Sequence, residues 1–215
     1  MSKMKSFVVS YVGVALLMLS QSSWALSMDV AVVTSVQGPI LQIDAKETGQ
    51  PLIAFSKLHQ GDKLEIKQNS RMQLVYFESG RQETWSGPGV VEIGTQASNS
   101  SLKPEVKLLP PLLAKQLSKT PASNVQGRAG MIVMRSISTP EKLKSIDENY
   151  ASLRSQVAPN ELSPELYLLS ALFEAKEFER IKAYLVDLGQ QYPDRDDVKD
   201  VISHYARMVT LATSK

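Results

Sequence analysis

The sequence contains no cysteine. This absence excludes disulfide bonds, thiolate nucleophiles, cysteine-ligated zinc and a lipid anchor on an N-terminal cysteine. Histidine is scarce as well, because His59 and His204 are the two that the chain has. Asp200 lies four residues before His204 on a predicted helix, and we interpret this pair as a solvated contact rather than a metal or acid–base pair. We therefore expect no metal site and no cofactor.

Motifs of the common enzyme classes are missing too. The sequence has no Gly-x-Ser-x-Gly elbow, no His-Glu-x-x-His helix and no Gly-Lys-Ser/Thr phosphate loop. We therefore predict that the protein is not an enzyme. Paired glycosidase carboxylates carry no local signature, so a hydrolase acting on envelope glycans or peptides is kept as an alternative.

Long hydrophobic runs are also few, and the one that stands out lies at the N-terminus. Lys3 and Lys5 precede an apolar run at residues 7–19, which is shorter than the roughly 20 residues that a membrane-spanning helix needs. Small residues follow it, and Ala25 precedes Leu26 at the expected cleavage site. We therefore expect a signal peptide at residues 1–25, a periplasmic location and no membrane span after cleavage; an uncleaved anchor is the alternative.

Processing also removes the excess of positive charge. The chain has 24 Lys and Arg residues and 22 Asp and Glu residues, a net charge of +2. Lys3 and Lys5 leave with the predicted signal peptide, whereas no acidic residue does. The remaining chain is formally neutral, so its charge gives no reason to expect nucleic acid as a partner.

The first half of the chain shows the alternation that is typical of β-strands. Apolar residues recur with period two through residues 30–93, and turn residues interrupt them every 8–12 residues or so. Val30, Val32 and Val36 are predicted to share one face of the first strand. Residues 72–77 are apolar on both faces, which predicts a central strand.

Turn and strand residues in this segment follow the order of a known module. They are Gly38, Leu58-His59-Gln60-Gly61-Asp62-Lys63-Leu64, Arg71-Met72-Gln73-Leu74-Val75, Glu78-Ser79-Gly80 and Trp85-Ser86-Gly87-Pro88-Gly89-Val90-Val91-Glu92-Ile93. This order resembles the FecR-type β domain of bacterial envelope proteins over about residues 28–97. Ser79-Gly80 stands where that family typically has Asp-Gly. The resemblance implies a small all-β sandwich or roll at residues 26–97.

The resemblance also bears on function. The iron-citrate regulator that gives the family its name resembles an anti-sigma factor, with a cytoplasmic segment and a membrane span before its β domain. The present chain has a predicted signal peptide in that place. The resemblance therefore implies the module rather than sigma-factor control, and a sensory or regulatory component of envelope signalling is an alternative function.

Residues 98–138 have the composition of a connector. A short helix is predicted at residues 111–117, with proline as an early helical residue. Residues 131–134 are predicted to add one further strand to the β domain. The apolar run Leu108–Leu113 is interpreted as packing, with an exposed docking strip as the alternative.

From Ser138 onward the apolar period changes from two to 3.6 residues, which predicts about four helices at residues 139–213. Thr139 and Ser163 are each followed by proline, the pattern of a helix cap before a first-turn proline. Together with the strands of the first half, these helices predict an α+β fold.

One stretch of these helices resembles a tetratricopeptide repeat. It runs from Leu168 to Pro193, where Phe178, Leu185 and Pro193 match the spacing of the aromatic, apolar and closing proline positions. Leu169 and Ile181 replace the small packing residues of that family. The resemblance implies a degenerate helical repeat, and a single unit cannot bury its apolar face alone.

These features together favour a non-catalytic periplasmic adaptor that binds envelope proteins. Exposed helix faces and sheet edges offer partner surfaces without any reactive group. Trp85 fits either a ligand surface or the core, and the core is the more usual place for a strand tryptophan. The candidate partner contacts are Trp85, Leu109, Leu112, Phe178 and Tyr205.

Overall fold

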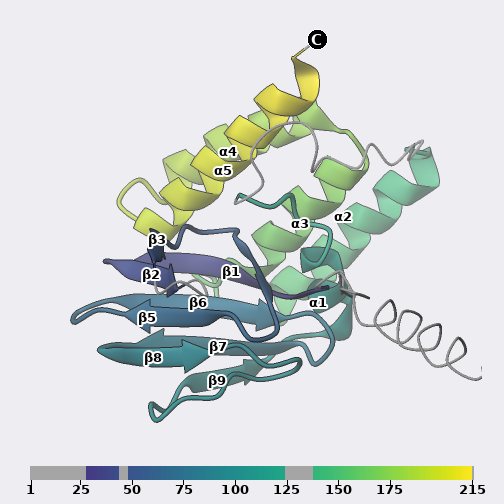
Figure 1. The fold of residues 1–215 in the computed structure, drawn as a ribbon. Coiled ribbons are helices and arrows are strands. Elements are labelled where there is room, and N and C mark those ends of the chain that lie inside the picture. Colours follow the sequence, from purple (N-terminus) through teal and green to yellow (C-terminus); the bar gives the residue numbers. More distant parts are fainter. Residues whose placement is uncertain (1–27, 44–47, 124–137, 215) are drawn as a thin grey trace, which may run out of the picture.

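The computed structural model describes residues 28–43, 48–123 and 138–214. These residues form nine β-strands and five α-helices, so the predicted α+β class is confirmed (Figure 1). The predicted signal peptide, its cleavage site at Ala25 and Leu26, and the predicted strand at residues 131–134 lie outside the described residues. No helix in the described ranges is both long enough and apolar enough to cross a membrane.

The strands form two antiparallel sheets. The first sheet has the order β4 (Lys57–His59), β1 (Asp29–Gln37), β6 (Arg71–Tyr76), β7 (Arg81–Ser86) and β9 (Glu105–Leu108). The second has the order β3 (Gly49–Pro51), β2 (Ile40–Ile43), β5 (Lys63–Ile66) and β8 (Gly89–Glu92). Strand β6 lies in the middle of the first sheet, as its two apolar faces predict.

A hydrophobic core fills the space between the two sheets. Leu74 and Trp85 from the first sheet and Leu64 and Val91 from the second belong to one buried cluster. Trp85 is 1% exposed and is the largest of the fully buried side chains. Period-two alternation explains this core, because alternate residues of each strand face the opposite sheet.

Strand β1 departs from simple alternation. Its register shifts between Asp29 and Ala31 against β4, and again between Val33 and Ser35 against β6. Each irregularity changes the face to which the following residues point. Val32 therefore packs in the cluster on the helical side of the sheet, whereas Val30 and Val36 pack against the core between the sheets. The prediction that these three valines share one face is wrong for this reason.

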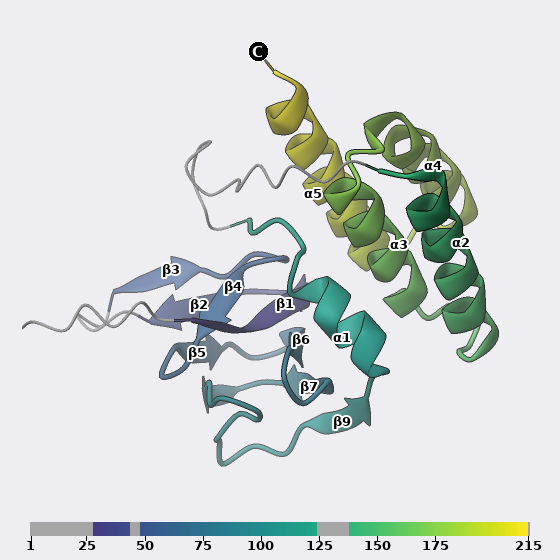
Figure 2. The same ribbon diagram turned by 90° about the vertical axis from the view of Figure 1, so that its right-hand side faces the viewer.

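The helices form a layer on the outer face of the first sheet (Figure 2). They are α1 (Pro111–Leu117), α2 (Pro140–Ser155), α3 (Ser163–Glu174), α4 (Phe178–Gln191) and α5 (Asp196–Thr213). Helix α1 has the bounds that the sequence predicts and lies between the strands and the other helices (Figure 2). The strand β9 that precedes it was not predicted.

A second hydrophobic core lies between the first sheet and the helices. Val32 and Val75 from the first sheet, Leu113 from α1 and Leu169 from α3 belong to the same buried cluster. The segment that composition marks as a connector thus contributes β9 to the sheet and α1 to the packing between sheet and helices. The order from one side to the other is second sheet, first sheet and helices.

Of the two predicted helix caps, Thr139 and Ser163, the structure confirms the first. The Thr139 side chain accepts a hydrogen bond of 3.3 Å from the backbone N–H of Lys142, which confirms the predicted cap of α2. Ser163 does not cap α3, because it lies inside the helix and its hydroxyl contacts Glu161. The first ten residues of α3 are all buried, since α1, α2, α4 and α5 surround this helix.

Candidate functional site

A cleft of about 900 Å³ lies at one end of the first sheet. It lies where the start of β1, the turn between β6 and β7, and helix α1 meet. A cleft of this size is typical of sites that hold a small molecule or a few side chains of a partner. Its lining residues are Met28, Asp29, Val30, Gln60, Phe77, Glu78, Ser79, Gly80, Thr95, Leu109, Pro111, Ala114, Lys115 and Ser118.

Gly80 shapes the wall of this cleft. Its φ angle is +65°, in the left-handed region that favours glycine. Its carbonyl accepts a hydrogen bond of 2.9 Å from the Leu109 N–H, which fastens the end of β9 to the β6–β7 turn. A Cβ atom at this position would lie 2.9 Å from the Leu109 carbonyl oxygen. Position 80 therefore needs glycine.

The buried side chain of Lys57 holds helix α1, whose residues line part of the cleft. The ammonium group of Lys57 on β4 donates hydrogen bonds to the carbonyls of Leu117 (3.2 Å) and Ser118 (2.9 Å) at the end of α1. It also lies 4.4 Å from the centre of the Phe77 ring. Burial lowers the pKa of Lys57 to about 8, against a smaller raising effect of the Asp29 carboxylate. A cation at the C-terminal end of a helix is favourable, so Lys57 holds α1 in place beside the sheet.

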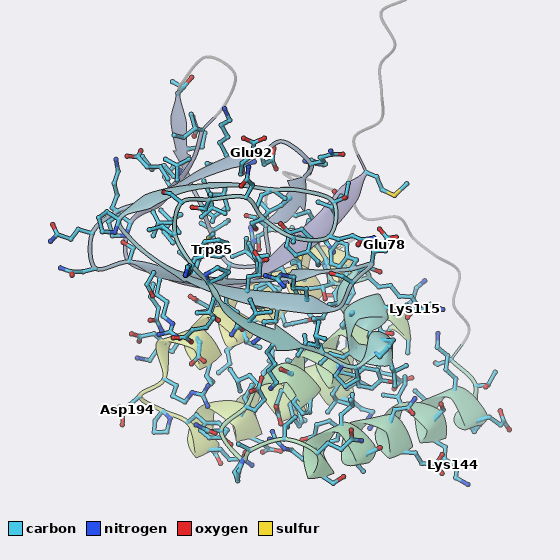
Figure 3. All side chains as sticks on the ribbon, turned by 90° about the horizontal axis from the view of Figure 1, so that it is seen from below. Glu78, Trp85, Glu92, Lys115, Lys144 and Asp194 are labelled. Carbon is cyan, nitrogen blue, oxygen red and sulfur yellow. The ribbon has the colours of Figure 1, made fainter. Side chains whose placement is uncertain are left out.

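The rim of the cleft carries charges of both signs. Glu78 lies on the β6–β7 turn and Lys115 on α1, and Figure 3 shows both on the same side of the molecule. Both are exposed, and within the described residues neither forms an ion pair. An apolar floor with a charged rim is the usual anatomy of a site that binds part of another protein.

Exposed apolar side chains continue from the cleft along β9 and α1. Leu108 is 71% exposed, Val106 46% and Leu112 42%, whereas Leu109 and Leu113 are buried. Burial of Leu109 and Leu113 agrees with the predicted packing role of the run Leu108–Leu113. Leu108 and Leu112 are exposed, and docking of a partner on them stays a prediction.

Several predicted contact residues lie inside the protein. Trp85 (1% exposed), Leu109 (6%) and Tyr205 (0%) are buried. The assignment of Trp85 and Tyr205 as partner contacts is therefore corrected, whereas Leu109 lines the cleft. The indole N–H of Trp85 donates a hydrogen bond of 3.0 Å to the buried carboxylate of Glu83, and Figure 3 shows this tryptophan among the strands.

Phe178 and Leu112 differ from these three. Phe178 is partly buried and its ring packs edge-on against Phe173, with 5.6 Å between the ring centres. Leu112 is the one predicted contact residue whose side chain is well exposed. Leu109 keeps a part in the site, because it lines the cleft.

His204 lies in the core and not on the surface. Its Nδ1 atom is 2.8 Å from the Ser123 hydroxyl, and its ring stacks on Phe55 with 4.2 Å between the ring centres. Burial lowers the pKa of His204 to about 3, and the positive charges of Arg207 and Lys57 add to this effect. The interpretation of His204 and Asp200 as a solvated pair is therefore wrong.

A serine beside a histidine is also the beginning of a nucleophile–base pair. In this case His204 is 4% exposed and Ser123 6%. Among the described residues, no carboxylate is hydrogen-bonded to His204 in the way that orients a catalytic histidine. A substrate does not reach either side chain in this arrangement, and we assign the pair to packing.

The structure shows no metal-binding group of side chains in its described part, and comparisons with known proteins give no match. Within the described ranges, no three His, Asp or Glu side chains are grouped so that they would hold a metal ion. No protein-family model, no curated protein and no solved structure matches the chain.

Proposed function

We propose that this chain is a non-catalytic periplasmic adaptor that binds a segment of an envelope protein in the cleft beside α1. The observation that carries this proposal is the 900 Å³ cleft, whose apolar floor includes Val30, Phe77 and Leu109. Glu78 and Lys115 at its rim are free to pair with polar groups of a partner. Apolar floors give affinity and charged rims give orientation in such sites.

The proposed family assignments fit this function. The two antiparallel sheets with a common core support a FecR-like β module at residues 26–97. Helices α3 and α4 support a degenerate tetratricopeptide-like unit, in which Leu169 and Ile181 are both fully buried. In this proposal the helices serve mainly as a support for the sheet and α1, since α3 buries nearly its whole surface.

The function is tested by co-purification from envelope extracts. Met28 is 81% exposed on one wall of the cleft and Lys115 is exposed on the other, so Met28→Glu and Lys115→Glu change the site without disturbing the core. The matched control is Val186→Glu on α4, because Val186 is 59% exposed and lies away from the cleft lining. We expect the two cleft variants to lose a specific envelope protein that the wild type and the control retain. Equal recovery by all four proteins would exclude the cleft as the binding site.

A further inference from the structure

Strand β9 is an open edge of the first sheet. It is last in the order of that sheet, and β7 is its one strand partner in the described part of the chain. The Leu109 N–H donates to the Gly80 carbonyl at the end of the strand. Successive residues of a strand direct their backbone N–H and C=O groups to opposite sides. Lys107 and Glu105, two and four residues before Leu109, therefore also direct theirs to β7. The N–H and C=O groups of Val106 and Leu108 therefore point to the open side.

The same two residues bring apolar surface to this edge. Val106 is 46% exposed and Leu108 is 71% exposed. Proteins usually protect an open edge by charge or by proline, because an exposed edge pairs readily with another strand. Here Pro104 and Pro110 bound the strand and Glu105 and Lys107 carry charge, but the two positions whose backbone groups are unpaired carry valine and leucine. An edge of this kind is suited to pairing with one further strand.

We propose that β9 pairs antiparallel with β9 of a second copy of this chain, with Val106 opposite Val106. In this register the two valines exchange backbone hydrogen bonds, and the Leu108 N–H donates to the Pro104 carbonyl of the other copy. Pro104 has no N–H, but its carbonyl is able to accept. The sheet then runs through both copies as one continuous sheet.

Charge selects both the occupant and the register. With Val106 opposite Val106, Glu105 of each copy lies opposite Lys107 of the other, and both pairs are attractive. A shift that centres the pairing on Lys107 would place two lysines opposite each other, which is unfavourable. The short sequence Glu105-Val106-Lys107 is therefore complementary to itself in one antiparallel register.

Both charged side chains stay accessible despite their contacts within the chain. The Glu105 carboxylate is 2.8 Å from Arg71, yet its side chain is 75% exposed. The Lys107 ammonium is 2.9 Å from Glu161, and the lysine side chain is 43% exposed. Each group has room for a second partner, as exposed carboxylates and ammonium groups accept several hydrogen bonds.

The dimer is expected to be weak. Pairing of two four-residue strands buries less than the roughly 1,200 Å² of a standard interface, so the contact belongs to the transient class. Sedimentation equilibrium of the purified, processed protein is the suitable measurement. A series up to about 1 mM detects association even at a dissociation constant near that value. We expect the wild type to shift from monomer to dimer over this series.

Charge variants test the register. Glu105→Lys and Lys107→Glu each place like charges opposite one another at two points of the dimer, so we expect each variant to associate roughly tenfold more weakly. An equimolar mixture of the two variants restores both attractive pairs and is expected to form the mixed dimer. Glu148→Lys on α2 is the matched control, because its side chain is 66% exposed and its partner Lys144 lies on the same helix.

A backbone variant tests the edge itself. Val106→Pro removes an N–H that points away from β7, and proline is tolerated at such edge positions. We expect this variant to fold, as judged by an unchanged circular dichroism spectrum, and to stay monomeric.

Three results would overturn the proposal. They are a wild type that is monomeric throughout the series, a dimer that Val106→Pro leaves intact, and a mixture of charge variants that associates no better than either alone. If the wild type is monomeric while Val106→Pro loses an envelope protein in co-purification, the edge takes a strand from that protein instead. The cleft variants Met28→Glu and Lys115→Glu are expected to keep the dimer, so failure here is distinct from failure of the proposed adaptor function.

Discussion

Protonation of His204 is expected to destabilise the protein as the pH falls. The imidazole is buried between Ser123 and Phe55, and its pKa in the folded state is lowered to about 3 from the ordinary 6.5. Below pH 6.5 the His204 imidazole therefore becomes protonated in the unfolded chain, whereas it stays neutral in the folded chain until the pH approaches 3. The contribution of His204 to stability is fully present above about pH 7 and is lost progressively as the pH falls from 6.5 toward 3.

The size of this effect follows from the two pKa values. At pH 5 the unfolded state gains about 2 kcal/mol from protonation of this one residue, while the folded state gains almost nothing. Lys57, whose pKa is lowered to about 8, keeps its proton below that value and adds no slope between pH 5 and 7. The imidazole is 4% exposed, so screening by solvent reduces the effect little.

The contribution of His204 to the free energy of unfolding is measured by urea denaturation of the wild type and of His204→Asn at pH 5, 6, 7 and 7.5. Asparagine keeps a polar group near Ser123 but does not titrate. We expect the stability difference between the two proteins to shrink by about 2 kcal/mol from pH 7.5 to pH 5. A difference that stays constant over this range would refute the burial of a neutral His204 in the folded protein.

Two further predictions concern the packing that positions the cleft. Leu113→Ala removes a side chain that is 1% exposed between sheet and helices, and we expect a loss of about 3 kcal/mol. Urea unfolding followed by Trp85 fluorescence for the sheets and by circular dichroism for the helices should give coincident transitions, and separate ones would contradict the shared core. Gly80→Ala is expected to cost about 1–2 kcal/mol in the same assay, because its Cβ would lie 2.9 Å from the Leu109 carbonyl oxygen; an unchanged midpoint would show that the turn relaxes freely.

Local patterns predict much of the fold. Alternation finds the central strand around Leu74, and the prolines at 111 and 140 mark the starts of two helices. These features depend on residues near one another in the chain, so the sequence carries them directly. The short strand β9 escapes prediction because its four residues, Glu105–Leu108, are charged and apolar in alternation but lie in a segment rich in serine and proline.

Contacts between distant parts of the chain carry no such pattern. Lys57 reaches the end of α1, sixty residues away, and the sequence has no signal for this hydrogen bond. His204 on α5 pairs with Ser123 in the loop after α1, whereas the local pair with Asp200 suggested a solvent-exposed histidine. Val32 is misplaced because the register shifts that turn it toward the helices arise from pairing with β4 and β6. Of the predicted contact residues, the structure leaves Leu112 exposed and keeps Leu109 at the cleft.

The central claim is that the cleft beside α1 holds a segment of an envelope protein. The most direct test is photo-crosslinking in living cells from a light-activated residue placed at position 115 on the rim, with position 186 on α4 as the control. We expect position 115 to yield a crosslink to one particular envelope protein, and position 186 to yield none. The same crosslinks from both positions, or none from position 115, would contradict the claim.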